Sequence, residues 1–190
     1  MPNWCTTTYK CVGDPKEVRS LYDIIRSCEK TSRVTNGFGN LWLGNIVDAL
    51  GEDCENVYCR GEITDYYIEE TDSRVLCINQ ETAWREQNGF RHAIERKFPS
   101  IKVYFIDDEP GCDWFVTNDR ERKFFSFPVT VEFCTEDDSY WEDFRSEKDA
   151  LDYIRKEYGL DGKDAICAFN EENEGKDSYI YLHEYEFIDD

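Results

Sequence analysis

Positive charge is scarce in this sequence. Its 190 residues include 42 Asp and Glu but only 22 Lys and Arg, which gives a formal net charge of −20 and a pI near 4.4. Phosphate backbones and anionic membrane surfaces repel such a chain. We therefore expect no direct nucleic-acid partner and no membrane partner.

Features of targeting and of oxidising compartments are also missing. No stretch approaches the roughly 20 apolar residues of a membrane-spanning helix, and the first ten residues lack the basic and apolar regions of a signal peptide. The nine cysteines include no Cys-x-x-Cys pair, and no Asn-x-Ser/Thr site occurs. We expect a cytoplasmic protein with reduced cysteines that act as small hydrophobic residues, above all those in apolar runs: Cys5, Cys11, Cys77 and Cys167.

Motifs of common enzymes are absent as well. The sequence has no Gly-rich phosphate loop, no Gly-x-Ser-x-Gly and no His-Glu-x-x-His. Cys54 and Cys59 have the spacing of half a zinc site, but no second pair accompanies them. The two histidines, His92 on a predicted helix and His183 on a predicted strand, are best explained as packed or surface residues. Catalysis is therefore disfavoured, and we expect no cofactor.

Hydrophobic residues make up 40% of the chain and aromatic residues 15%, which predicts a folded core rather than disorder. Apolar periodicity indicates an α+β protein. The first part of the chain is predicted to contain, in order, a strand at 3–12, a helix at 15–30, a short helix ending at Gly51, strands at 57–70 and 74–79, a helix at 82–97 and a strand at 101–106. With the short helix as an insertion, this is the βαββαβ order of a ferredoxin-like sandwich, an antiparallel sheet with helices on one face.

The rest of the chain follows another pattern. It predicts strands at 112–117 and 123–134, a helix from a Ser146 cap to Tyr158, and strands at 165–169 and 178–188. We expect a ferredoxin-like core at 1–131 and an acidic, βαββ-like extension at 132–190 that packs on it or continues it as one domain.

The negative charge is concentrated in this extension. Residues 1–131 contain 22 acidic and 16 basic residues, whereas 132–190 contain 20 and 6. Spaced carboxylates on a folded surface can imitate a nucleic-acid backbone and bind a basic protein groove, although charge runs are more often solvated faces. The partner-binding hypothesis rests on Glu136, Asp137, Asp138, Asp149, Asp152, Glu171, Glu172, Glu174, Glu184 and Glu186.

A second acidic cluster lies at a predicted strand end. Asp107, Asp108, Glu109 and Asp113 offer the oxygen ligands that a hard divalent cation prefers. The segment lacks the spacing of an EF-hand loop, and its Pro-Gly dipeptide is also typical of a plain turn. A metal site or metal-dependent enzyme at 107–113 is therefore the alternative hypothesis.

Aromatic residues line one side of the last predicted strand: Tyr179, Tyr181, Tyr185 and Phe187. Exposed rings on a sheet can stack nucleic-acid bases, but such surfaces also carry Lys and Arg, which are missing here. We expect these rings to pack between sheet and helix. If exposed, they would fit a protein interface rimmed by carboxylates better than RNA binding.

Three short segments together resemble a known family. They are the opening Met-Pro-Asn-Trp-Cys leading to Gly13, the Glu-Thr-Ala-Trp at 81–84, and the Glu-Pro-Gly at 109–111 followed by Thr-Asn-Asp at 117–119. Over residues 1–130 the chain resembles the YubB-like family of bacterial plasmid, conjugative-element and phage proteins, described as carrying a ferredoxin-like domain. Thr7 departs from the asparagine common at that position.

The resemblance implies a setting but no activity or catalytic residue. A small acidic protein of a mobile element would have basic host targets, such as nucleases and other defence enzymes. We expect a non-enzymatic binding protein that inhibits such an enzyme by nucleic-acid mimicry; a structural or scaffolding module is the remaining alternative.

Overall fold

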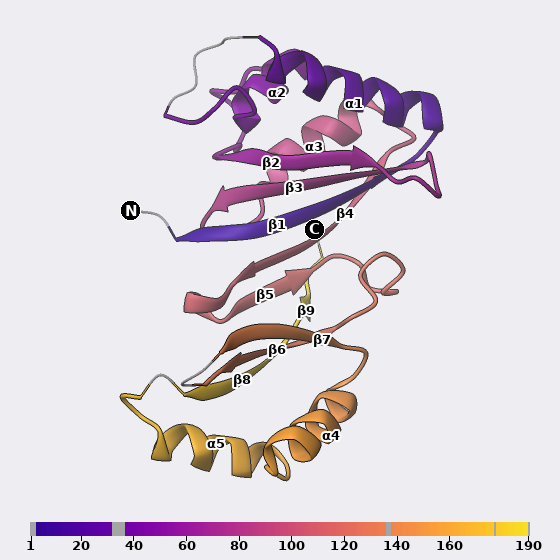
Figure 1. Cartoon of the computed structure of the whole chain (residues 1–190). Helices are drawn as coiled ribbons and strands as arrows, with labels where there is room; N and C mark the ends of the chain where they lie inside the picture. Colours follow the sequence, from indigo (N-terminus) through magenta and orange to yellow (C-terminus); the bar gives the residue numbers. More distant parts are fainter. Residues whose placement is uncertain (1–2, 32–36, 136–137, 177, 190) are drawn as a thin grey trace. The chain divides into compact units, whose positions relative to one another are not determined.

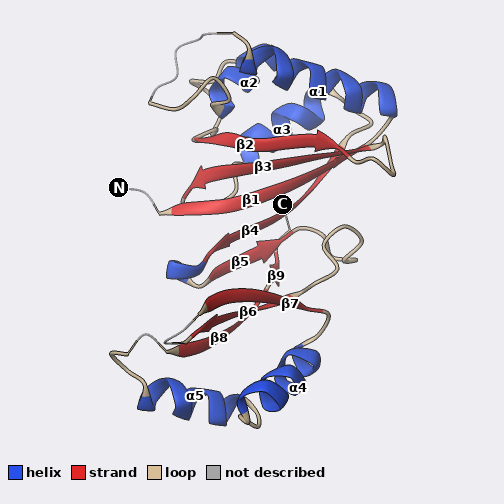
Figure 2. Cartoon of the chain, in the orientation of Figure 1, coloured by secondary structure: helices blue, strands red, loops and turns tan. Residues whose placement is uncertain are grey.

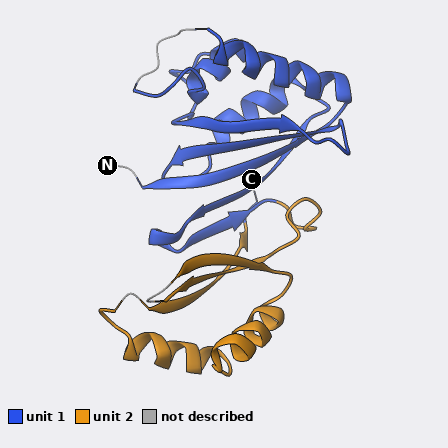
Figure 3. Ribbon diagram, viewed as in Figure 1, with its two compact units in different colours: residues 1–118, 188–190 blue, residues 119–187 orange. Residues whose placement is uncertain are grey.

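The computed structural model describes residues 3–31, 37–135, 138–176 and 178–189. The chain forms two compact units: unit 1 contains residues 1–118 and 188–190, and unit 2 contains residues 119–187 (Figure 3). The sequence predicted a boundary at 131/132 instead. The observed boundary lies earlier because the strand at Val129–Cys134 pairs with two strands that follow it.

Unit 1 is an antiparallel sheet with helices packed on one face (Figures 1 and 2). Its elements are, in chain order, β1 (Trp4–Val12), α1 (Pro15–Glu29), α2 (Leu43–Leu50), β2 (Gly61–Ile68), β3 (Val75–Ala83), α3 (Asn88–Lys97), β4 (Lys102–Glu109), the 3-10 turn η1 (Pro110–Cys112) and β5 (Trp114–Thr117). The strands lie in the order β2-β3-β1-β4-β5, and every neighbouring pair is antiparallel. The expected α+β class is confirmed.

Helix α1 illustrates why the sequence folds this way. The Asp14 side chain accepts a hydrogen bond from Lys16 N, and Pro15 occupies the first turn, where its missing N–H costs nothing. The apolar side of the helix, at three- and four-residue spacing, is fully buried: Val18, Leu21, Ile25 and Cys28. The predicted helix at 15–30 is confirmed.

The predicted helix at 82–97 begins too early. Thr82 and Ala83 extend β3, where they pair with β1, and α3 begins only at Asn88. Trp84 ends the strand with a φ of 73°, in the left-handed region that side chains other than glycine rarely adopt. Trp84 therefore lies in the connection between β3 and α3, and only Phe90 lies on the helix, so the apolar spacing of these two residues is not that of one helix face.

Unit 2 contains a second, three-stranded sheet. Its elements are β6 (Val129–Cys134), β7 (Ser139–Phe144), α4 (Glu147–Tyr158), α5 (Lys163–Glu172), β8 (Tyr179–Glu184) and β9 (Glu186–Phe187). This three-stranded sheet, sheet B, has the order β7-β6-β8 with antiparallel neighbours. Helices α4 and α5 pack on one face of sheet B over a separate core that includes Val131, Phe133 and Ile154.

The βαββ-like order expected for this region is wrong. The predicted strand at 165–169 lies inside α5, and β7 occupies residues for which the sequence predicts no strand. A short apolar run is ambiguous between helix and strand; here Ile166 is buried in the core, and the Asn170 side chain exchanges two hydrogen bonds with the Ile180 backbone. The α4 prediction is confirmed, with Ser146 as N-cap.

Within the described ranges, the structure contains no helix that combines the length and the apolar character needed to cross a membrane.

Candidate functional site

The four acids of the predicted metal site do not converge. Asp107 points to the helix-covered face of β4 and is fully buried, whereas Asp108, the next residue, points to the other face. Asp113 follows the η1 turn and is exposed. Glu109 lies on the same side as Asp107, but both oxygens of Asp107 are already occupied by protein donors. Residues 107–113 therefore offer no shared point for a cation.

Asp107 instead holds together three parts of unit 1. Its carboxyl accepts hydrogen bonds from Thr7 Oγ1 at 2.5 Å, Glu86 N at 2.8 Å and Trp114 Nε1 at 2.7 Å. These donors belong to β1, the β3–α3 connection and β5. Burial raises the pKa of Asp107, and the three hydrogen bonds oppose this effect only in part. No cation pairs with this carboxyl among the contacts of the described residues.

A buried ion pair lies next to Asp107. Arg91 Nε is 2.9 Å from Glu86 Oε1, and the two side chains are 4% and 6% exposed. The Tyr9 hydroxyl donates to the same Glu86 oxygen, and the Arg91 guanidinium lies over the Phe105 ring, 5.2 Å from its centroid. Burial raises the pKa of Glu86, while Arg91 opposes this shift.

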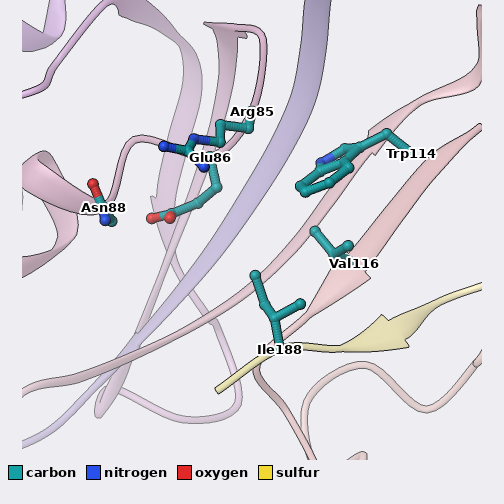
Figure 4. A pocket seen from close by; sticks show the side chains of 6 residues that line it. All are labelled: Arg85, Glu86, Asn88, Trp114, Val116 and Ile188. Carbon is teal, nitrogen blue, oxygen red and sulfur yellow. The ribbon is translucent and has the colours of Figure 1, made fainter. Parts of the chain in front are cut away.

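The β3–α3 connection borders a small pocket (Figure 4). Arg85, Glu86 and Asn88 line one side of this cavity of about 80 Å³, and Trp114, Val116 and Ile188 line the other. Sequence reasoning did not identify this pocket because its walls come from segments far apart in the chain. The volume holds only a few water molecules, and its walls combine one exposed cation with the paired carboxylate of Glu86.

One group of possible metal ligands lies elsewhere. In the described part of the chain, the ligand atoms that lie close enough to share an ion belong to Asp48, Asp53 and Cys54, of which both acids are exposed. Cys54 N and the Asp48 carboxylate are also hydrogen-bonded. Such a turn is common without a metal, so this group remains a structural loop.

The acids of the partner-binding hypothesis fall into two groups in unit 2. Glu136 and Asp137 lie outside the described residues, and the other eight are all exposed. One group is at the end of sheet B where β7 and β8 begin: Asp138, Glu171, Glu172 and Glu174. The other group lies on α4, which follows β7, and at the end of β8 and start of β9: Asp149, Asp152, Glu184 and Glu186. The acids therefore do not form a single row.

Between these groups, sheet B presents an aromatic face. Val131, Phe133 and Ile180 point toward α4 and α5, so the alternate residues of the same strands point away from both helices. Trp141 and Tyr181 on this second face are 43% and 48% exposed. The sequence predicted that Tyr179 and Tyr181 pack between sheet and helix. The structure places both on the opposite face of sheet B, so this prediction is wrong for these two residues.

The structure places the cysteines and histidines in different environments. Cys5, Cys11 and Cys77 are buried, as predicted, but Cys167 is exposed on α5. Burial and nearby carboxylates raise the pKa of the Cys5 thiol, which keeps it protonated at neutral pH. His92 lies on α3 and His183 is buried on β8, stacked against Trp141.

Comparison with known proteins found no match: no protein-family model matches the chain, and neither curated proteins nor solved structures gave a similar sequence or fold.

Proposed function

We propose that the protein is a non-enzymatic binding protein whose acidic unit 2 binds a basic surface on a partner protein. The charge balance of unit 2 carries this proposal: its 69 residues include 20 acidic and 9 basic ones. A surface with this excess accelerates encounter with basic partners and disfavours acidic ones.

The exposed carboxylates of unit 2 support the same conclusion. Several of them form no ion pair with any residue in the described ranges, so their charge is not neutralised by the protein itself; among these are Glu171, Glu172, Glu174, Glu184 and Glu186. By contrast, Asp152 pairs with Arg155 on α4. An unpaired carboxylate is the group that gains most from a basic partner.

Two finer expectations accompany the proposal. The strand order β4-β1-β3-β2, with α1 after β1 and α3 after β3, supports a ferredoxin-like relationship for unit 1. The resemblance to the YubB-like family supports a mobile-element setting, in which the partner is a host nucleic-acid-binding or defence enzyme inhibited by mimicry of DNA or RNA. Both remain proposals.

The test compares two variants with the same change in net charge. In one, Glu171, Glu172 and Glu174 are replaced by Gln; in the other, Glu55, Glu70 and Glu81, which are exposed acids of unit 1, are replaced by Gln. The immobilised full chain is exposed to a bacterial extract at about 0.1 M salt, and captured proteins are identified by mass spectrometry.

We expect one basic protein to be retained by the wild type and the unit 1 variant, to be lost from the unit 2 variant, and to elute before 1 M salt. Failure to retain any basic protein at low salt, or equal loss in both variants, would contradict the proposal.

A further inference from the structure

Three residues on the aromatic face of sheet B lie in one row across its strands. Glu132 on β6 pairs directly with Trp141 on β7 and with Tyr181 on β8. The two rings flanking this carboxylate are the exposed ones, at 43% and 48%. The row therefore consists of one acid between two partly exposed aromatic side chains.

Neighbouring rings extend this row into a continuous surface. Trp141 stacks on His183 with ring centroids 5.8 Å apart and an interplanar angle of 23°. Tyr181 contacts Tyr179 with centroids 5.0 Å apart. Rings that are already packed against one another lose little side-chain freedom when a ligand binds, which lowers the entropic cost of binding.

The Glu132 carboxylate is held in place but can still accept hydrogen bonds from a ligand. Glu132 Oε1 accepts a hydrogen bond from the Tyr179 hydroxyl at 2.9 Å, while Oε2 has no hydrogen-bond partner in the described part of the chain. Asp143, two residues beyond Trp141 on the same side of β7, adds an exposed second carboxylate. The face thus combines aromatic rings with negative charge and carries no Lys or Arg on the described strand positions.

We propose that the row of Trp141, Glu132 and Tyr181 is a binding site for an arginine side chain of the partner protein. A guanidinium group is planar, so it stacks on the exposed indole or phenol ring while its N–H groups donate to Glu132. A lysine ammonium can pair with the carboxylate but cannot stack as a plane. This inference rests on the proposed function and adds the chemistry of the partner side chain.

A protein segment fits this face better than single-stranded nucleic acid. Bases can also stack on exposed rings, but known surfaces of that type add cations for the phosphates. Here the nearby charges are Glu132 and Asp143, and unit 2 as a whole has 11 more acidic than basic residues. Charge complementarity therefore favours a basic peptide.

The experiment measures binding of fluorescein-labelled decapeptides to the full chain by fluorescence anisotropy. One peptide alternates Arg with Gly, a second alternates Lys with Gly, and a labelled oligothymidine of the same length tests nucleic acid. The variants are Glu132→Gln and Tyr181→Ala. Their matched controls are Glu142→Gln, an exposed acid on the other side of β7, and Tyr67→Ala, an exposed tyrosine of β2.

We expect the Arg peptide to bind about fivefold more tightly than the Lys peptide. Glu132→Gln should weaken binding of the Arg peptide about tenfold, and Tyr181→Ala about fivefold. Both controls should change it less than about twofold. Thermal unfolding of each variant shows whether a loss of binding reflects a loss of folding.

Two results overturn the arginine site alone: equal affinity for the two peptides, or equal effects of Glu132→Gln and Glu142→Gln. Salt-sensitive binding in either case would leave the acidic unit intact as the proposed binding surface. Preferential binding of the oligothymidine would overturn both proposals, because it would identify the face as a nucleic-acid surface.

Discussion

The carboxyl group of Asp107 accepts the backbone N–H of Glu86 at 2.8 Å, which ties β4 to the segment that leads into α3. The same carboxyl accepts the indole N–H of Trp114. Asp107 therefore fixes Trp114, which lines the pocket, and also the backbone of Glu86, which forms the buried ion pair with Arg91.

Replacing Asp107 by Ala should destabilise unit 1 strongly. The change leaves the N–H groups of Glu86 and Trp114 without their acceptor inside the protein, and we expect a loss of about 2–4 kcal/mol in the free energy of unfolding. Urea unfolding followed by circular dichroism measures this loss. Asp65→Ala, at an exposed acid of the same sheet, should change it by less than about 0.5 kcal/mol; equal effects of the two substitutions would show that the hydrogen bonds of Asp107 do not anchor unit 1.

Asp107→Asn should reveal the cost of burying the charge. Burial raises the pKa of Asp107 in the folded state, so the folded protein binds this proton more tightly than the unfolded chain. The resulting stabilisation is complete below the unfolded-state pKa of about 4 and is lost as pH rises through the folded-state pKa. The amide stays neutral, and the Thr7 hydroxyl can reorient toward Thr82 to accept its N–H.

The stability of Asp107→Asn relative to wild type should therefore increase from pH 4.5 to pH 7.5. Urea unfolding at several pH values across this interval provides the measurement. A difference that stays constant with pH would mean that Asp107 titrates alike in the folded and unfolded states.

The elements with clear local signals could be predicted from the sequence. Helices α1 and α4 have polar N-caps and a regular apolar side, and Gly51 and Gly159 end α2 and α4 with positive φ values. These signals involve residues within a few positions of one another, so a single sequence contains them. The acidic character of unit 2 is likewise a property of composition.

The arrangement of the site could not be predicted in the same way. Thr7, Glu86, Asp107 and Trp114 meet only because β1, β4 and β5 are neighbours in the sheet. The pairing of Glu132 with Trp141 and Tyr181 depends on strand register. A shift of one residue in a strand would turn its side chains to the opposite face of the sheet. The same alternation separates the acids of the predicted metal site, since Asp107 and Asp108, which are adjacent on β4, point to opposite faces.

Replacing Arg91 by Met should cost more than breaking a comparable exposed ion pair. The change leaves the Glu86 carboxylate buried without its cation, for which we expect a loss of about 3–5 kcal/mol in the free energy of unfolding. Arg96 pairs with Glu52 at 2.6 Å, but its side chain is 56% exposed, so Arg96→Met should cost about 1 kcal/mol or less.

The double variant Glu86→Gln with Arg91→Met should recover part of the loss caused by Arg91→Met, because it removes the buried charge that the single variant leaves unpaired. Chemical denaturation of the wild type, Arg91→Met, Arg96→Met and the double variant measures these differences in the free energy of unfolding. A double variant that is no more stable than Arg91→Met would indicate that lost packing of Arg91 over Phe105, rather than the unpaired charge, dominates.

Trp84 provides a test of backbone strain in the β3–α3 connection. Its φ of 73° is unfavourable for any residue with a Cβ atom, and its ring is 53% exposed. Glycine adopts this conformation freely, so Trp84→Gly should be more stable than Trp84→Ala by about 1 kcal/mol. At Tyr67, an exposed position within β2, the order should reverse, because glycine weakens an ordinary strand. Thermal unfolding of the four variants measures both differences, and the same order at both positions would contradict a left-handed Trp84.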